Sequence, residues 1–143
     1  MSGISSRGSR PAPRVGGHGW VGVLCFVLLA WRPLSFAFQL PATLPSMGMR
    51  GAAGVVELLF HGGVAALSVA AARALWGALP IGPPLAAAAL IASAAAAIQS
   101  LYWSVLPHQT MPGDELPLAI GAAVHAAAWL TYLARSRRID AMR

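Results

Sequence analysis

Residues Leu85–Leu106 read LAAAALIASAAAAIQSLYWSVL, a run of twenty-two positions without a charged side chain. A helix needs about 20 consecutive apolar residues to cross a bilayer, so this run predicts a membrane span. Only 10% of the 143 residues are charged, whereas soluble domains average about a quarter. The chain therefore has too few charged residues for an ordinary water-soluble domain. The alanine and serine content of the run also suits close approach between helices in lipid.

Three more apolar blocks accompany this run, and short polar or proline-rich segments separate them. The connectors are Pro41–Met49, PIGPP at Pro80–Pro84, and PHQTMPGDE at Pro107–Glu115. Prolines such as those of PIGPP end a helical block because they lack the backbone N–H. We predict an all-α polytopic membrane protein, a small bundle of four transmembrane helices within residues 18–134. The predicted helices span about 19–40, 51–79, 85–106 and 116–134.

Charge is concentrated at the two ends of the chain. Residues 1–17 are rich in Arg, Ser, Pro and Gly, a composition that predicts a disordered tail, and residues 135–143 form a basic tail. All ten basic residues are arginines, and seven lie in the tails: Arg7, Arg10, Arg14, Arg135, Arg137, Arg138 and Arg143.

The positive-inside rule assigns arginine-rich flanks to the cytoplasm. An even number of spans puts both tails there, whereas three spans would place one tail outside. We therefore predict four spans in a bacterial inner membrane, with both termini cytoplasmic. Nucleic acid is excluded as a partner, because a nucleic-acid-binding protein displays its basic patch on a folded soluble face.

Arg32 and Pro33 interrupt the first block. A four-span chain must carry Arg32 inside the membrane. The rival interpretation is a secretory signal peptide, since a basic region precedes an apolar one. We prefer a retained helix, because no small-x-small cleavage motif follows and Arg32-Pro33 falls where that motif should be.

The other strongly polar residues of the spans lie at similar depths. With a helical rise of about 1.5 Å per residue, they fall in the outer half of the bilayer. This predicted polar layer contains one or two residues from each helix: Arg32, Glu57, His61, Gln99 and His125.

Charged groups at this depth are stable only when they pair or face a polar interior. We expect Arg32 to pair with Glu57, and His61, four residues after Glu57, to contact it on the same helix face. Pro33 cannot bond the carbonyl of Leu29, so we expect a kinked helix with a free acceptor.

The layer has two interpretations. The structural one holds that it fixes which helices pack together, with about 1 kcal/mol per contact. The functional one is a proton relay or a small-ligand site. Its sharpest form is a haem b with His61 and His125 as axial ligands, because two mid-depth histidines are the minimum for such a site.

The motifs of common enzymes do not occur. GVVELLFHGG lacks the lysine of a phosphate-binding loop, and the Glu57/His61 spacing is not that of a zinc-binding H-E-x-x-H. A single cysteine, Cys25, excludes a disulfide framework and metal-type cysteine spacing. We predict a non-enzymatic accessory, assembly or stabilising subunit without a cofactor or metal, which contacts lipid and acts alone or beside a larger membrane complex. The alternative is a transporter or redox-carrier subunit.

Aromatic residues and arginines flank the spans where the membrane interface is expected. Trp20 and Trp76 fall at the cytoplasmic side, and Tyr102 and Trp103 at the outer side. We predict that the C-terminal segment AWLTYLARSRR anchors the chain at the cytoplasmic interface, because arginines there gain about 1 kcal/mol each from anionic lipid. The predicted anchors are Trp129, Tyr132, Arg135, Arg137 and Arg138.

Several of these features resemble a family of small bacterial inner-membrane proteins catalogued as domain of unknown function 2569. The shared features are the Gly19-Trp20 start with the later Pro33, and Glu57 early in the second helix. The ending AWLTYLARSRRID also matches, through Trp129, Tyr132, Ser136 and Arg138, with Ile139 where the family has valine. PIGPP stands where such proteins carry a charged cluster, and AMR replaces the usual Thr-Phe ending. The resemblance covers most of the chain after the N-terminal tail, and it implies a four-helix topology but no activity.

Overall fold

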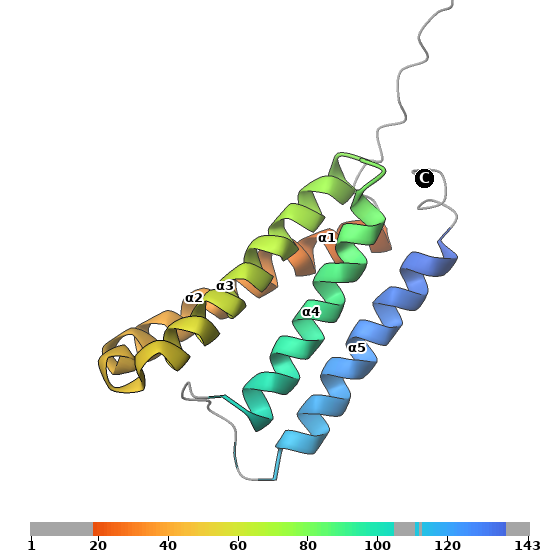
Figure 1. Ribbon diagram of the computed structural model, residues 1–143. Helices are drawn as coiled ribbons and strands as arrows, with labels where there is room; N and C mark the ends of the chain where they lie inside the picture. Colours follow the sequence, from red (N-terminus) through yellow and green to blue (C-terminus); the bar gives the residue numbers. More distant parts are fainter. Residues whose placement is uncertain (1–18, 105–110, 112, 137–143) are drawn as a thin grey trace, which may run out of the picture.

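The computed structural model describes residues 19–104, 111 and 113–136, and these residues contain helices but no strand. Four of the helical segments are long and apolar enough to cross a membrane. The all-α fold with four spans is thus confirmed (Figure 1). The first span joins α1, a π-helical turn η1 and α2, and the bounds are α1 Trp20–Phe26, η1 Val27–Trp31, α2 Arg32–Thr43, α3 Met47–Trp76, α4 Gly82–Tyr102 and α5 Glu115–Arg135.

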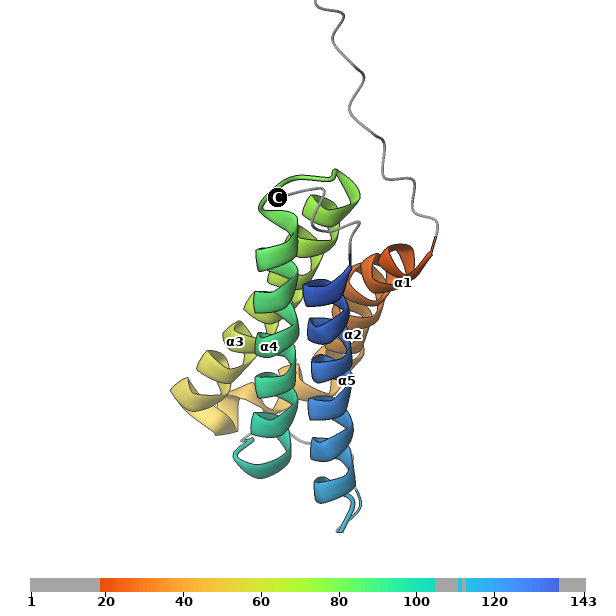
Figure 2. The same cartoon turned by 90° about the vertical axis from the view of Figure 1, so that its right-hand side faces the viewer.

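The helices form a small bundle in which α4 lies between α3 and α5. Figures 1 and 2 both show this order, and the first span packs along α3. The start of α1 and the end of α5 lie at the same end of the bundle, since the rings of Trp20 and Trp129 are 6.5 Å apart. This arrangement follows from an even number of spans. We call the end of the bundle with the start of α1 and the end of α5 the Trp20 end.

The apolar core lies toward the Trp20 end. It brings together α1, η1, the second half of α3 and the first half of α4, with Leu133 from α5. Leucines fill its centre, and Leu24, Leu28 and Leu75 are almost completely buried. The first segment therefore contributes one wall of this core. The buried residues are Val21, Leu24, Cys25, Leu28, Ala71, Ala72, Leu75, Ala86, Ala89, Leu90 and Leu133.

The first span contains a π-helical turn, Val27–Trp31, directly before Arg32 and Pro33. The ring of a proline clashes with the carbonyl four residues earlier, here that of Leu29, and removes one hydrogen bond. A wider turn relieves this crowding, and π turns are a known cause of helix irregularity. We attribute the π turn to Pro33, the residue from which a kink was expected.

The connector between the first two spans differs from the prediction. We expected a turn-rich segment at Pro41–Met49, but the chain stays helical through the end of α2, the 3₁₀ turn η2 (Leu44–Ser46) and the start of α3. The helical run is broken at Gly51, which has φ 59° and ψ −151°. Only glycine adopts that conformation readily, so the break between the first two spans falls at Gly51, after the predicted connector.

The turn between α3 and α4 is tight. The Leu79 N–H donates to the Ala74 carbonyl at 2.9 Å, and Ala78 has a left-handed φ of 51°. This is the Schellman pattern, in which the left-handed position is usually glycine. Pro83 and Pro84 lie in the first turn of α4 and not in the connector, because proline needs no N–H partner there.

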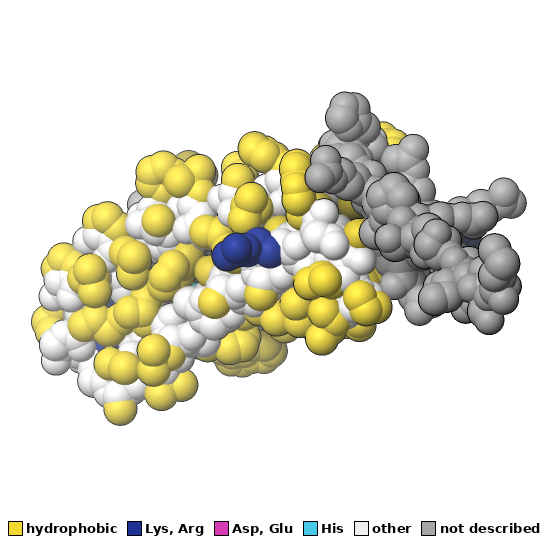
Figure 3. Space-filling view, turned by 90° about the horizontal axis from the view of Figure 1, so that it is seen from above, with side chains coloured by type: hydrophobic (Ala, Val, Ile, Leu, Met, Phe, Trp, Pro, Cys, Tyr) yellow, Lys and Arg dark blue, Asp and Glu magenta, His cyan; other side chains and the backbone are white. Residues whose placement is uncertain are grey.

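The outer surface of the bundle is largely apolar. Large hydrophobic side chains such as Phe38, Val56, Leu59 and Val124 are exposed, and Figure 3 shows hydrophobic side chains over the face seen from above. Exposed apolar surface of this extent is unusual for a soluble monomer but normal against acyl chains. The tails at 1–17 and 137–143 lie outside the described residues.

Candidate functional site

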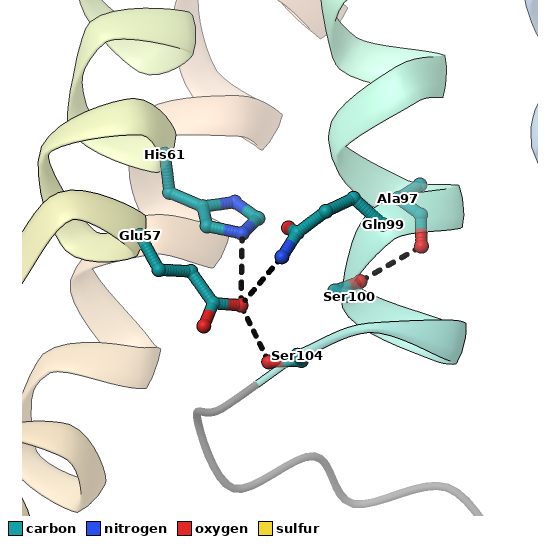
Figure 4. A network of polar contacts seen from close by, with 6 residues as sticks. All are labelled: Glu57, His61, Ala97, Gln99, Ser100 and Ser104. Carbon is teal, nitrogen blue, oxygen red and sulfur yellow. Dashed lines mark hydrogen bonds and ion pairs between the residues drawn. The ribbon is translucent and has the colours of Figure 1, made fainter. Parts of the chain in front are cut away.

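Glu57 is the centre of a polar cluster between α3 and α4 (Figure 4). Its side chain is buried, with 6% of the residue exposed. One carboxylate oxygen, Oε1, accepts hydrogen bonds from the Gln99 amide at 3.0 Å and from the Ser104 hydroxyl at 2.5 Å. The same oxygen lies 3.9 Å from His61 Nε2. We call these four residues the Glu57 cluster.

Local helix geometry and helix packing each supply part of this cluster. Glu57 and His61 are one turn apart on α3, so the predicted contact between them is confirmed. Gln99 comes from the last turns of α4, and Ser104 follows the end of that helix. Hydrogen bonds to an ionised group are stronger than neutral ones. The cluster therefore joins α3 to α4 at the end opposite Trp20.

Arg32 does not reach Glu57, so the predicted pair is wrong. Its guanidinium donates to the backbone carbonyl of Ser93 on α4 at 3.0 Å, and it makes no ion pair with an acidic side chain among the described residues. Similar depth in the membrane did not bring the two charges together. The predicted polar layer is thus two sites: the Glu57 cluster, and a separate site around Arg32.

Two cavities border Arg32. The larger, about 210 Å³, lies between the first span, α4 and α5, and contains Ser93 and His125 in its walls. The smaller, about 40 Å³, lies on the side of α3, and its polar lining residues are Arg32, Ser35, Gln39 and His61. We call them the α5 cavity and the α3 cavity. Since Arg32 lines both cavities, it stands between His125 and His61.

The two candidate haem ligands do not share a site. His61 lines the α3 cavity, while His125 is exposed in the α5 cavity, with its ring 6.3 Å from that of Trp129. A haem with two axial histidines needs both imidazoles on opposite faces of one porphyrin. This donor set does not fit such a haem. Among the described residues, no group of three or more His, Cys, Asp or Glu could hold a metal ion.

The predicted interface anchors differ in their surroundings. Trp129 is half-buried and packs edge-on against Trp20 and Tyr132, so it also closes the core. Arg135 is exposed at the end of α5. Arg137 and Arg138 lie outside the described residues.

Three residues of these sites were not predicted from the sequence: Ser93, Ser104 and Gln39. Ser93 is buried, accepts the Arg32 hydrogen bond through its carbonyl and lines the α5 cavity. Serine is common in membrane helices, where its hydroxyl usually bonds its own backbone, as Ser68 does to Val64. No sequence signal therefore separates Ser93 and Ser104 from the other serines.

The separation of Arg32 from Glu57 predicts weak energetic coupling between them. We expect a double-mutant cycle with Arg32→Leu and Glu57→Leu to give a coupling free energy below about 0.5 kcal/mol, as for residues without a shared partner. Unfolding of the four proteins in mixed detergent micelles measures this quantity. A coupling free energy above about 1.5 kcal/mol would show that Arg32 and Glu57 interact directly.

The fold and the polar sites define the chain as a multi-pass helical membrane protein with buried polar clusters between its spans. Comparisons with protein-family models, with curated proteins and with solved structures found no match. The resemblance to domain of unknown function 2569 therefore stays a prediction.

Proposed function

We propose that the protein is a non-enzymatic accessory or stabilising component of the bacterial inner membrane, acting beside a larger membrane protein. The observation that carries this proposal is the exposure of α5. In an apolar stretch of 18 residues within α5, only 11% is buried inside the bundle, whereas the corresponding share is 28% in α3 and in α4. Its main packing partner is α4 alone. A span packed on one side leaves most of its surface for lipid or for another helix.

The exposed side of α5 is rich in small residues. Gly121, Ala127 and Ala128 are exposed, and a Cβ added at Gly121 would meet no atom within 4 Å. Small residues let helix backbones approach closely in lipid, where dispersion contacts and hydrogen bonds drive association. Charge complementarity is not needed for such a contact. The α5 surface therefore suits a partner helix.

The Glu57 cluster supports a structural role for the buried polar groups. Both a side chain of α4 and the residue after α4 donate to one oxygen of Glu57. Interhelical hydrogen bonds of this kind contribute roughly 0.6 to 1.7 kcal/mol each in membrane bundles. This carboxylate oxygen therefore holds α3 and α4 together through hydrogen bonds.

The accessory role predicts that a bulky residue on α5 displaces the partner. We expect Gly121→Phe to abolish co-purification of a specific membrane protein in gentle detergent, while Val56→Phe, on the exposed side of α3, preserves it. Quantitative mass spectrometry of the purified complexes measures the ratio. A native protein that purifies alone, or equal recovery of the partner with both variants, would refute the proposal.

For orientation we propose that the Trp20 end is cytoplasmic, as the arginines of the tails suggest. Arg73 and Arg135 support it, since both lie toward that end, whereas Asp114 and Glu115 lie at the opposite end with Arg50. Reporter fusions to the two termini would test it, and activity of an exported reporter at either terminus would reverse the orientation.

A second candidate function, a proton relay, is favoured by the α3 cavity. Its volume of about 40 Å³ can hold a water molecule between Arg32 and His61, and His61 is 3.9 Å from Glu57. These groups would form a polar path across α3. Proton flux into liposomes that contain the native protein, and its loss in Glu57→Gln, would support this function. Flux no greater than that of protein-free liposomes would rule it out.

A further inference from the structure

The α5 cavity combines one polar wall with apolar and small side chains. Arg32 of the first span and Ser93 of α4 contribute polar groups, and His125 contributes a third from α5. Ala94 and Ala122 also line it, and its walls include both the buried Leu28 and Trp31, which is 65% exposed. The cavity therefore lies between the bundle interior and the lipid-facing surface.

The charge of Arg32 is not balanced within the described part of the chain. Its hydrogen bond goes to a backbone carbonyl, and it makes no ion pair there. A carbonyl accepts a hydrogen bond but does not neutralise a positive charge. An unpaired charge inside a membrane is costly and is offset when an anion approaches.

Ser93 adds a second independent observation. The residue is 4% exposed, and its hydroxyl has no hydrogen-bond partner among the described residues. A buried hydroxyl without a hydrogen-bond partner is destabilising. Arg32, Ser93 and His125 can all donate hydrogen bonds. A cavity with three donors and one fixed positive charge selects an anionic acceptor, such as a carboxylate.

We propose that the α5 cavity binds the carboxylate of a single-chain amphipathic acid, such as a fatty acid. Arg32 is the counter-ion, the Ser93 and His125 side chains donate to the carboxylate oxygens, and the alkyl chain leaves past Trp31 into the bilayer. A volume of about 210 Å³ accommodates the carboxyl group and the first methylenes, while lipid surrounds the rest of the chain. This binding site is separate from the Glu57 cluster and from the accessory role.

Depth and shape decide between possible sources of the carboxylate. Arg32 is twelve residues beyond Trp20, about 18 Å along the span, which lies deeper than the headgroups of two-chain lipids. A partner helix would have to pass the exposed ring of Trp31 before a short acidic side chain could reach Arg32. A thin alkyl chain meets neither obstacle.

The test uses the full-length protein in phosphatidylcholine nanodiscs, with dansyl-labelled undecanoic acid as the probe at mildly alkaline pH, where the carboxyl group is ionised. We expect saturable binding to the native protein and binding of the methyl ester weaker by about tenfold or more, because the ester loses the charge-assisted hydrogen bonds. Arg32→Gln should weaken binding of the acid by a similar factor. Arg73→Gln, an exposed arginine at the Trp20 end of α3, is the matched control and should bind as the native protein does.

A further variant keeps the test decisive if Arg32→Gln fails to fold. Ala122→Phe fills the α5 cavity and leaves Arg32 in place, so it should abolish saturable binding. Equal affinity for acid and ester, native-like binding by Ala122→Phe, or binding that rises linearly with probe concentration would each overturn the proposal. Displacement of the acid by a quinone of equal chain length at lower concentration would also overturn it, because a neutral carbonyl would then be the preferred ligand.

Discussion

Replacement of Glu57 by alanine should lower the free energy of unfolding by about 2 kcal/mol. The variant loses the hydrogen bonds from Gln99 and Ser104, each contributing about 1 kcal/mol in a membrane bundle, and the Gln99 amide loses its acceptor on Glu57. Denaturation with sodium dodecyl sulfate in mixed micelles, followed by tryptophan fluorescence, measures the loss. Glu57→Gln keeps an acceptor oxygen at this position and should cost less than about 1 kcal/mol.

Val56→Ala is the matched control for this substitution. Val56 precedes Glu57 on α3 but is 66% exposed to the surroundings of the bundle. Its truncation should change stability by no more than about 0.5 kcal/mol. If Glu57→Ala unfolds at the same denaturant concentration as Val56→Ala, the Glu57 cluster does not tie α3 to α4.

The second large effect is expected at Gly82, where α4 begins against the end of α3. A Cβ at this position would lie 3.1 Å from the Ala74 carbonyl carbon and oxygen and from the Leu75 nitrogen. These are backbone atoms of a helix that is itself fixed in the core, so they cannot move aside as a side chain can. We expect Gly82→Ala to destabilise the protein by about 1–3 kcal/mol, the usual cost of overpacking.

Gly121→Ala is the control for Gly82→Ala in the same denaturation experiment. A Cβ at Gly121 meets no atom within 4 Å, and alanine favours the helix over glycine by about 1 kcal/mol. We expect this variant to be as stable as the native protein or slightly more stable, as measured by the same denaturation. Equal loss at Gly82 and Gly121 would mean that the α3–α4 turn is not closely packed.

Helix lengths were the part of the fold that could be read most directly from the residues. The uncharged run from Leu85 to Leu106 was predicted as a span, and α4 covers Gly82–Tyr102. The shift at its start comes from Pro83 and Pro84, which occupy the first turn of a helix when no partner is needed for their missing N–H. Boundaries that depend on capping and tight turns, such as the break at Gly51, were therefore less predictable.

Among the polar residues, the outcome depended on the range of the interaction. The contact of Glu57 with His61 follows from one turn of a regular helix, so their spacing was sufficient. The helical rise gives the depth of a residue but not its rotation about the helix axis. That rotation, altered in the first span by the π turn before Pro33, directs Arg32 to Ser93 and away from Glu57.

The sequence by itself determined that the chain crosses a membrane four times, because the length of an apolar run is set against the thickness of the bilayer alone. Only the tertiary structure decided which polar groups meet. Partner choice between helices depends on axial rotation and on which helices are neighbours, and α4 lies between α3 and α5. For that reason His61 and His125 line different cavities, although their positions in the sequence suggested a common layer.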